Sequence, residues 1–219
     1  MKKFLFGMIS VGLMASVLCG CEKEDISMKA ADIEKQSIVV FDDGKVQASL
    51  IEEFKEDYYD VEELEEFMKE NIETYNTANG TSVELSSIEL NKSNVIAIFD
   101  FADVDEFAQY CTADTTYREE VATEEAISVK FLTGKKAKKD DLVPDEINKY
   151  GKKKTKKTSK AIKDDYKVFI IDNTNGAIQD DLDITVDGEI KFTTNVSKVD
   201  DNTCSISGLD GVAVVVFEP

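Results

Sequence analysis

The sequence predicts an α+β fold in which helices pack on an antiparallel or mixed sheet. Short runs of alternating apolar and polar residues, separated by Asp-Gly and Asn-Gly turns, predict strands near both ends of the chain. A helical apolar period after Asp60 predicts one long helix. From Val46 to Phe131 the predicted order is β-α-β-β-α-β, the order of a ferredoxin-like core, and a β-rich C-terminal part follows it.

The first predicted elements are a hairpin and the long helix. Ile38–Phe41 and the alternating segment Val46–Leu50 flank an Asp-Gly turn, which is a strong hairpin signal. Asp60 is a good N-cap residue, and Glu63 stands three residues later, as in a capping box. The helix is expected to end at Asn79-Gly80 and to carry one apolar stripe, made of Val61, Leu64, Phe67, Met68, Ile72 and Tyr75.

A second hairpin, a second helix and a further strand complete the predicted core. Val83–Leu90 and Val95–Phe101 are expected to pair across a turn at residues 91–94. Asp103 with Glu106 repeats the capping signal and predicts a short helix. Ile127–Phe131 alternates as the last strand of the pattern.

Residues 134–165 differ from the rest in composition. A first lysine run is followed, after a polar stretch interrupted by Pro144, by a second run. The two runs consist of Lys135, Lys136, Lys138 and Lys139, and of Lys152, Lys153, Lys154, Lys156 and Lys157. We expect a long exposed loop here, with a little helix near Ile147 or Ile162.

The remainder is predicted to be rich in strands. Expected strands cover Tyr166–Ile171, Ile190–Thr194 and Thr203–Ser207, with turns at Asn175-Gly176 and Asp187-Gly188. The continuous apolar run Val212–Phe217 predicts a strand buried on both faces. Residues 37–219 are therefore expected to form a single domain.

The first twenty residues have the composition of a secretory signal peptide. Two lysines precede the apolar run Phe4–Leu18, which is shorter than the about 20 residues that a membrane span requires. The run ends in Leu18-Cys19-Gly20-Cys21, which resembles a lipobox. The resemblance implies cleavage before Cys21 and a diacylglyceryl group on its sulfur; the alternatives are an ordinary leader with an incidental cysteine and an uncleaved anchor. The polar residues 21–36 then predict a flexible tether, and the domain is expected on the extracytoplasmic face of the cell membrane.

The charge balance narrows the range of partners. The chain has 26 Lys and Arg against 45 Asp and Glu, and its net charge is −19. Removal of residues 1–20 removes two lysines and no acids, so the mature net charge becomes −21. Such a surface repels nucleic acid, which is therefore not an expected partner.

Cys111 and Cys204 are the two cysteines of the predicted domain. Outside the cell, such a pair can form a disulfide, which would close a loop of roughly 90 residues and stabilise the fold by about 4–5 kcal/mol. The alternative is two separate buried thiols, because cysteine also behaves as a small apolar residue.

Little in the sequence points to catalysis. The chain has no His, which excludes Ser-His-Asp and Cys-His catalysis, and it has no Gly-rich phosphate loop. Paired carboxylates could still serve a hydrolase, although there is no Trp to stack on a sugar. Two acidic clusters, Asp100 to Glu106 and Asp172 to Asp180, do not match an EF-hand loop, and we favour helix caps and turns for them. We expect neither a cofactor nor a metal.

Two other features are candidate binding surfaces. Tyr58 and Tyr59, between two aspartates, would form either an aromatic binding lip or an anchor for the start of the helix. The second lysine run would either contact an anionic wall polymer, lipid or protein partner, or balance the acidic body as a solvated loop. Near an anionic membrane surface each lysine contributes about 1 kcal/mol.

Several of these motifs together resemble a known group. Gly44-Lys-Val46 with its alternating strand, Asp57-Tyr-Tyr-Asp60, and a helix ending near Tyr75-Asn76 are similar to uncharacterised lipoproteins of clostridial gut Firmicutes. A fainter similarity is to lipid-associated envelope lipoproteins of actinobacteria, although Asp187-Gly188 stands where Pro-Gly is expected. The resemblance implies a Gram-positive envelope lipoprotein with this topology, and the group has no established activity. The leading hypothesis is therefore a non-catalytic binding module, and the alternative is a carboxylate-dependent extracytoplasmic hydrolase.

Overall fold

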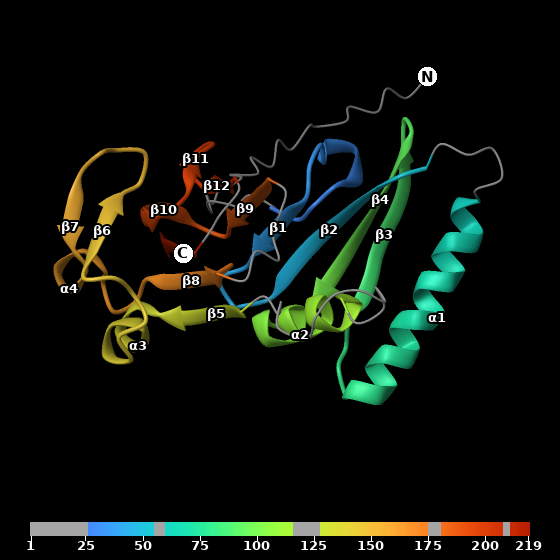
Figure 1. Ribbon diagram of the computed structural model, residues 1–219, viewed down its shortest axis with the longest axis horizontal. Coiled ribbons are helices and arrows are strands. Elements are labelled where there is room, and N and C mark those ends of the chain that lie inside the picture. The colour runs from blue at the N-terminus through green and yellow to red at the C-terminus, as the bar shows by residue number, and fades with distance from the viewer. Residues whose placement is uncertain (1–25, 55–59, 116–127, 175–180, 208–210) are drawn as a thin grey trace, which may run out of the picture.

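The computed structural model describes residues 26–54, 60–115, 128–174, 181–207 and 211–219, and it is an α+β protein, as predicted (Figure 1). The helices of these residues are η1 (Ala30–Asp32), α1 (Val61–Asn79), α2 (Val104–Thr115), α3 (Gly134–Lys139) and α4 (Thr158–Ala161). The first sheet contains β1 (Ser37–Val40), β2 (Val46–Glu53), β3 (Glu84–Asn91), β4 (Asn94–Phe101), β9 (Leu182–Val186), β11 (Ser197–Lys198) and β12 (Thr203–Ile206). The second contains β5 (Ser128–Thr133), β6 (Glu146–Lys149), β7 (Thr155–Lys157), β8 (Lys167–Asp172), β10 (Glu189–Thr194) and β13 (Val212–Glu218).

The local signals of the N-terminal half are confirmed. β1 and β2 form an antiparallel hairpin, and Gly44 occupies its turn with a φ of 95°. The Asp60 carboxylate accepts hydrogen bonds from the backbone N–H groups of Glu62 and Glu63, at 2.8 and 3.3 Å, which satisfies two of the donors that a helix start leaves unpaired. Gly80 ends α1 in the left-handed conformation, with a φ of 69°.

The order of strands in the first sheet is β11-β12-β9-β1-β2-β4-β3. β4 lies between β2 and β3 and is antiparallel to both, so β2, α1 and β3 form a split β-α-β unit. The fourth strand of the predicted pattern, β5, pairs with β8 in the second sheet. There Phe131 packs on Phe217, with ring centroids 6.3 Å apart.

The main core lies between the two sheets and continues under the helices. Val40 and Phe99 of the first sheet belong to the same buried cluster as Phe169 and Phe217 of the second. β2, β3 and β4 extend beyond the second sheet, where α1 and α2 lie beside them (Figure 1). The predicted stripe of α1 is only partly buried: Ile72 is buried in the core, whereas Phe67 is 62% exposed.

The C-terminal run is the central strand of the second sheet, as predicted. The order of this sheet is β5-β8-β13-β10-β6-β7, and Ala213 to Phe217 are all buried. The predicted turn at Asp187-Gly188 joins β9 of the first sheet to β10 of the second. A Cβ atom at Gly188 would lie 2.3 Å from the carbonyl oxygen of Glu218, so only glycine fits where the chain passes between the sheets.

The prediction of a long loop over residues 134–165 is wrong. This segment forms α3, β6, β7 and α4; β6 and β7 extend one edge of the second sheet, and buried side chains of the segment pack on the outer face of that sheet. Ala137, Ile147 and Ile162 are buried there against Val214 and Val216 of β13. The apolar residues are too widely spaced among the lysines to show a period, but together they bury one face of the segment.

The prediction of a flexible tether is also wrong for residues 28–36, which we call the N-terminal strap. Ala30 and Ile33 are buried against Ile96 and Ile98 on the outer face of the first sheet. The Met28 backbone N–H donates to Gln47 Oε1 at 2.8 Å, so the strap is also hydrogen-bonded to β2. Residues 21–25 of the predicted tether lie outside the described residues.

Candidate functional site

The second lysine run lies at the tip of the β6–β7 hairpin. The Lys149 N–H donates to the Lys154 carbonyl at 2.9 Å, and the Lys152 N–H donates to the Lys149 carbonyl at 3.0 Å. Gly151 has a φ of 65°, in the left-handed region that favours glycine. These two bonds close the tip of the hairpin into a tight turn.

Tyr150 fixes the tip to both sheets. Its N–H donates to the Lys191 carbonyl of β10 at 3.0 Å, and its hydroxyl donates to the Thr203 carbonyl of β12. The ring is buried, and burial raises the pKa of Tyr150, so the hydroxyl remains a donor. Lys198 of β11 places its Nζ 5.2 Å from the ring centroid, within the range of a cation–π contact.

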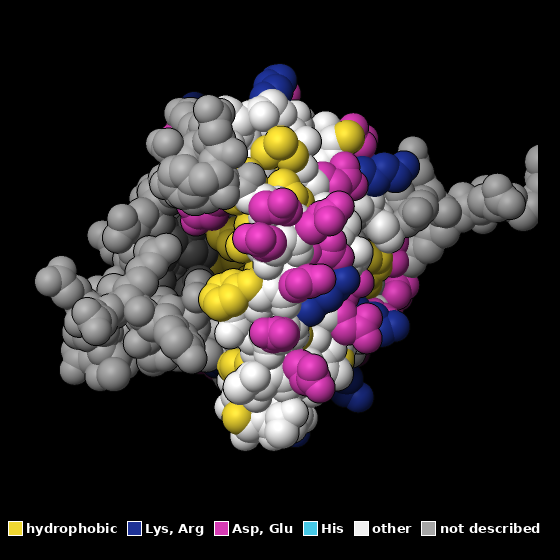
Figure 2. All heavy atoms as spheres, turned by 90° about the vertical axis from the view of Figure 1, so that its right-hand side faces the viewer, with side chains coloured by type: hydrophobic (Ala, Val, Ile, Leu, Met, Phe, Trp, Pro, Cys, Tyr) yellow, Lys and Arg dark blue, Asp and Glu magenta, His cyan; other side chains and the backbone are white. Residues whose placement is uncertain are grey.

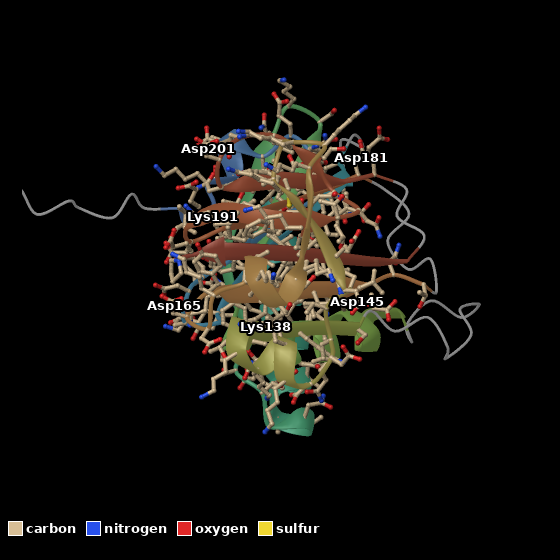
Figure 3. The ribbon with its side chains drawn as sticks, turned by 90° about the vertical axis from the view of Figure 1, so that its left-hand side faces the viewer. Lys138, Asp145, Asp165, Asp181, Lys191 and Asp201 are labelled. Carbon is tan, nitrogen blue, oxygen red and sulfur yellow. The ribbon has the colours of Figure 1, made fainter. Side chains whose placement is uncertain are left out.

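A close approach at Gly151 positions the fourth lysine. A Cβ atom on Gly151 would lie 2.7 Å from Cδ of Lys198, so the side chain of Lys198 occupies space that any other residue would fill. Lys198 Nζ also forms an ion pair with Asp201 at 2.6 Å. Figure 3 views the end of the molecule that carries the β6–β7 hairpin, with Asp201 in its upper part and Lys138 of α3 in its lower part.

These residues surround a hollow of about 410 Å³, which we call the basic hollow. It is lined by Asn148, Lys149, Gly151, Lys152, Lys153, Thr155, Thr193, Asn195, Val196 and Lys198. The lining contains four lysines and no carboxylate. Lys149, Lys152 and Lys153 form no ion pair with a carboxylate of the described residues, whereas Lys198 has Asp201.

The chemistry of the lining suits an anion that carries several oxygen atoms. Each ammonium group offers three donors, and the threonine hydroxyls add neutral ones. The volume is within the range of small-ligand sites, about 300–1,000 Å³, but such sites are mostly apolar and this lining is mostly polar. A hydrated, negatively charged group therefore fits better than an apolar ligand.

The structure places only part of the predicted lysine surface at this site. Lys152 and Lys153 line the hollow, whereas Lys154, Lys156 and Lys157 do not. Lys156 Nζ lies 5.8 Å above the ring of Phe192 instead. The sequence analysis did not include Lys149 and Lys198 in the lysine surface. The Tyr150-Gly151 turn could have indicated that Lys149 lies beside the second lysine run, but nothing in the sequence links Lys198 to this hairpin.

A second hollow, of about 230 Å³, lies at the opposite edge of the second sheet. It is lined by Ser128, Lys130, Asp141, Leu142, Ile170, Asp172 and Val212. Its one lysine faces two aspartates, so the lining has no excess of positive charge. It offers no comparable anion site.

Cys111 and Cys204 are not joined by a disulfide, so the alternative of separate thiols is the arrangement found. Cys204 is fully buried in the main core, and burial raises the pKa of its thiol to about 12. Because the thiolate is the nucleophile, Cys204 is a packing residue at neutral pH.

The acidic clusters are structural where they are described. The Glu106 N–H donates to Asp103 Oδ1 at 2.8 Å, which caps α2 as predicted. Buried Glu106 accepts from the backbone N–H groups of Ser82 and, at 2.7 Å, Ala102. Among the described residues, no group of three or more His, Cys, Asp or Glu side chains could hold a metal ion.

Other predicted sites lie outside the described residues: Cys21 with its leader, the pair Tyr58 and Tyr59, and the Asn175-Gly176 turn. In the described ranges, no helix is long and apolar enough to cross a membrane. No protein-family model matches the chain, and neither a curated protein nor a solved structure matches it.

Proposed function

We propose that the chain is a membrane-anchored lipoprotein on the extracytoplasmic face, which binds a phosphate-bearing anion without transforming it. The anchor is the lipid on Cys21, and the binding site is the basic hollow. The observation that carries the binding role is the convergence of four lysines on one hollow whose lining has no carboxylate, in a chain of net charge −19. An acidic body keeps nonspecific polyanions away, so attraction is confined to the hollow.

The rival function, a carboxylate-dependent hydrolase, has less support. It needs two acids that face an open cleft. Glu106 is the one buried carboxylate of the described residues, and its oxygens accept from the backbone N–H groups of Ala102, before α2, and of Ser82, before β3. All the charged residues that line the basic hollow are lysines, which donate hydrogen bonds. This lining suits the binding of an anion rather than acid–base chemistry.

The anchor is tested by the Cys21→Ala variant, expressed in a Gram-positive host and fractionated. Without the sulfur no diacylglyceryl group can be attached, so the protein should be released or remain as an uncleaved precursor. The control is Cys19→Ala, which keeps the anchoring cysteine and should stay in the membrane fraction. Full membrane retention of Cys21→Ala at the mature size would exclude the lipid anchor.

The binding site is tested by calorimetric titration with inorganic pyrophosphate at low salt. The triple variant Lys149→Gln, Lys152→Gln, Lys153→Gln should bind at least about tenfold more weakly, because three exposed charge contacts contribute about 0.5 kcal/mol each. Added salt should weaken wild-type binding, since exposed charges are screened.

The matched control changes the net charge equally, through Lys135→Gln, Lys136→Gln and Lys139→Gln. These lysines are exposed on α3 and do not line the hollow. The control should bind pyrophosphate like the wild type. Equal losses in both triple variants would mean that net charge, and not the hollow, attracts the anion.

A further inference from the structure

The strap limits how far the domain can stand from its anchor. Only residues 22–27 separate Cys21 from Met28, whose N–H is hydrogen-bonded to β2. Even a fully extended chain covers at most about 25 Å over this interval, at 3.3–3.6 Å per residue. A domain held by lipid on Cys21 therefore stays beside the membrane surface.

The C-terminal end of the strap lies near the basic hollow, whereas its N-terminal end, which leads to Cys21, lies on β2. Lys35 Nζ donates to Ser205 Oγ of β12 at 3.2 Å and forms an ion pair with Asp183 of β9 at 2.8 Å. Ser205 lies opposite Ser197 in the β11–β12 pair, and the next residue of β11 is Lys198, which lines the hollow. Neighbouring strands are about 4.8 Å apart, so β11 lies one strand away from the C-terminal end of the strap, and Lys198, the residue after Ser197, points to the opposite face of that sheet.

Charge favours one orientation of the domain at an anionic bilayer. The β6–β7 hairpin and α1 lie at opposite ends of the molecule (Figure 1). Residues 134–163 hold twelve lysines and four acids, whereas residues 61–79 hold six glutamates and one lysine. An anionic surface attracts the first end and repels the second, so it turns the hollow toward the bilayer.

We propose that the basic hollow faces the membrane that holds Cys21 and binds the phosphate group of an anionic phospholipid headgroup. This inference rests on the proposed lipid anchor and anion-binding site. Headgroups of the same membrane lie within the reach of the short linker, and tethering gives them a high effective concentration at the hollow.

The test uses the lipidated full-length protein in nanodiscs and measures, by mass spectrometry, how fast an amine-reactive reagent labels each lysine. Lys149, Lys152 and Lys153 should react at least threefold more slowly in discs that contain phosphatidylglycerol than in discs of phosphatidylcholine alone. Lys69 of α1 and Lys92 of the turn between β3 and β4 are exposed and lie outside residues 134–163, so they are the internal controls and should react equally in both. Insertion of a twelve-residue Gly-Ser segment between Ser27 and Met28 should reduce the protection, because a longer linker lowers the effective concentration.

Addition of soluble pyrophosphate to the phosphatidylcholine discs separates this inference from the proposed function. Protection by pyrophosphate without protection by phosphatidylglycerol would overturn the headgroup assignment and leave the anion site standing. Protection by neither would overturn both. Equal protection of the three hollow lysines in both kinds of disc would overturn the role of headgroup charge.

Discussion

The two ends of this molecule are both densely charged, but only one of them surrounds a hollow. At the acidic end, the glutamates of α1 are spread over a convex helical surface (Figure 2). At the basic end, three lysines of residues 134–163 and Lys198 of β11 surround a hollow of about 410 Å³. The difference lies in the shape of the backbone, which makes the basic surface concave and leaves the acidic surface convex.

Packing accounts for the difference between the ends. α1 is one regular helix that rests on β3 through part of its apolar stripe, so its charged side points outward. The basic end has no long element of its own. Its few apolar residues attach it to the second sheet, Tyr150 attaches it to both sheets, and the backbone between these points turns back on itself.

The largest effect that separates the two ends is expected from a pair of core substitutions. Ile147 of β6 is fully buried, so Ile147→Ala should lower the free energy of unfolding by about 2–5 kcal/mol. Met68 of α1 is partly exposed, so Met68→Ala should cost only about 1 kcal/mol. Urea denaturation of both variants measures the two costs.

The same two variants can also contradict the view that the two ends are packed differently. Equal costs at Ile147 and Met68 would mean that α1 is as firmly packed as the basic end. Binding of pyrophosphate by Ile147→Ala, measured well below its denaturation midpoint, should weaken as well, because the hairpin that carries Lys149 loses its support. Met68→Ala should leave binding unchanged.

A smaller effect is expected from pH. Side-chain hydrogen bonds from Lys191 and Lys163 lower the pKa of Glu218, whose oxygens lie 2.9 and 3.2 Å from the two ammonium groups. Because the folded-state pKa of Glu218 is lowered, its ion pairs stabilise the fold at pH values above the unfolded-state pKa. This stabilisation is lost as the pH falls through the lower, folded-state pKa. Glu218→Gln should therefore be less stable than the wild type at neutral pH and equally stable in strong acid.

Denaturation at a series of pH values, with Lys191→Gln as the partner variant in a double-mutant cycle, measures this contribution. The effect should be small because both groups are partly exposed to solvent. Stability curves of the wild type and Glu218→Gln that stay parallel at every pH would show that the ion pair contributes nothing.

Sequence reasoning succeeded where the signal is local. The caps at Asp60 and Asp103, the glycine turns and the buried run Val212–Phe217 all depend on residues within a few positions of one another. It failed for the strap and for the basic end. There the apolar residues are isolated in sequence, as Ile33 and Ile147 are, and only the surface onto which they pack shows that they are buried.

The sequence by itself determined the α+β class, the acidic balance, the leader pattern at Cys21 as an expectation, and the presence of a lysine-rich segment. Only the tertiary structure decided that Lys149, Lys152 and Lys153 meet Lys198, which lies 45 positions after Lys153 in the chain. The physical reason is that helix caps and strand alternation are short-range properties of the backbone. A hollow between two sheets depends instead on which distant strands pair, and that is set by the burial of the whole core.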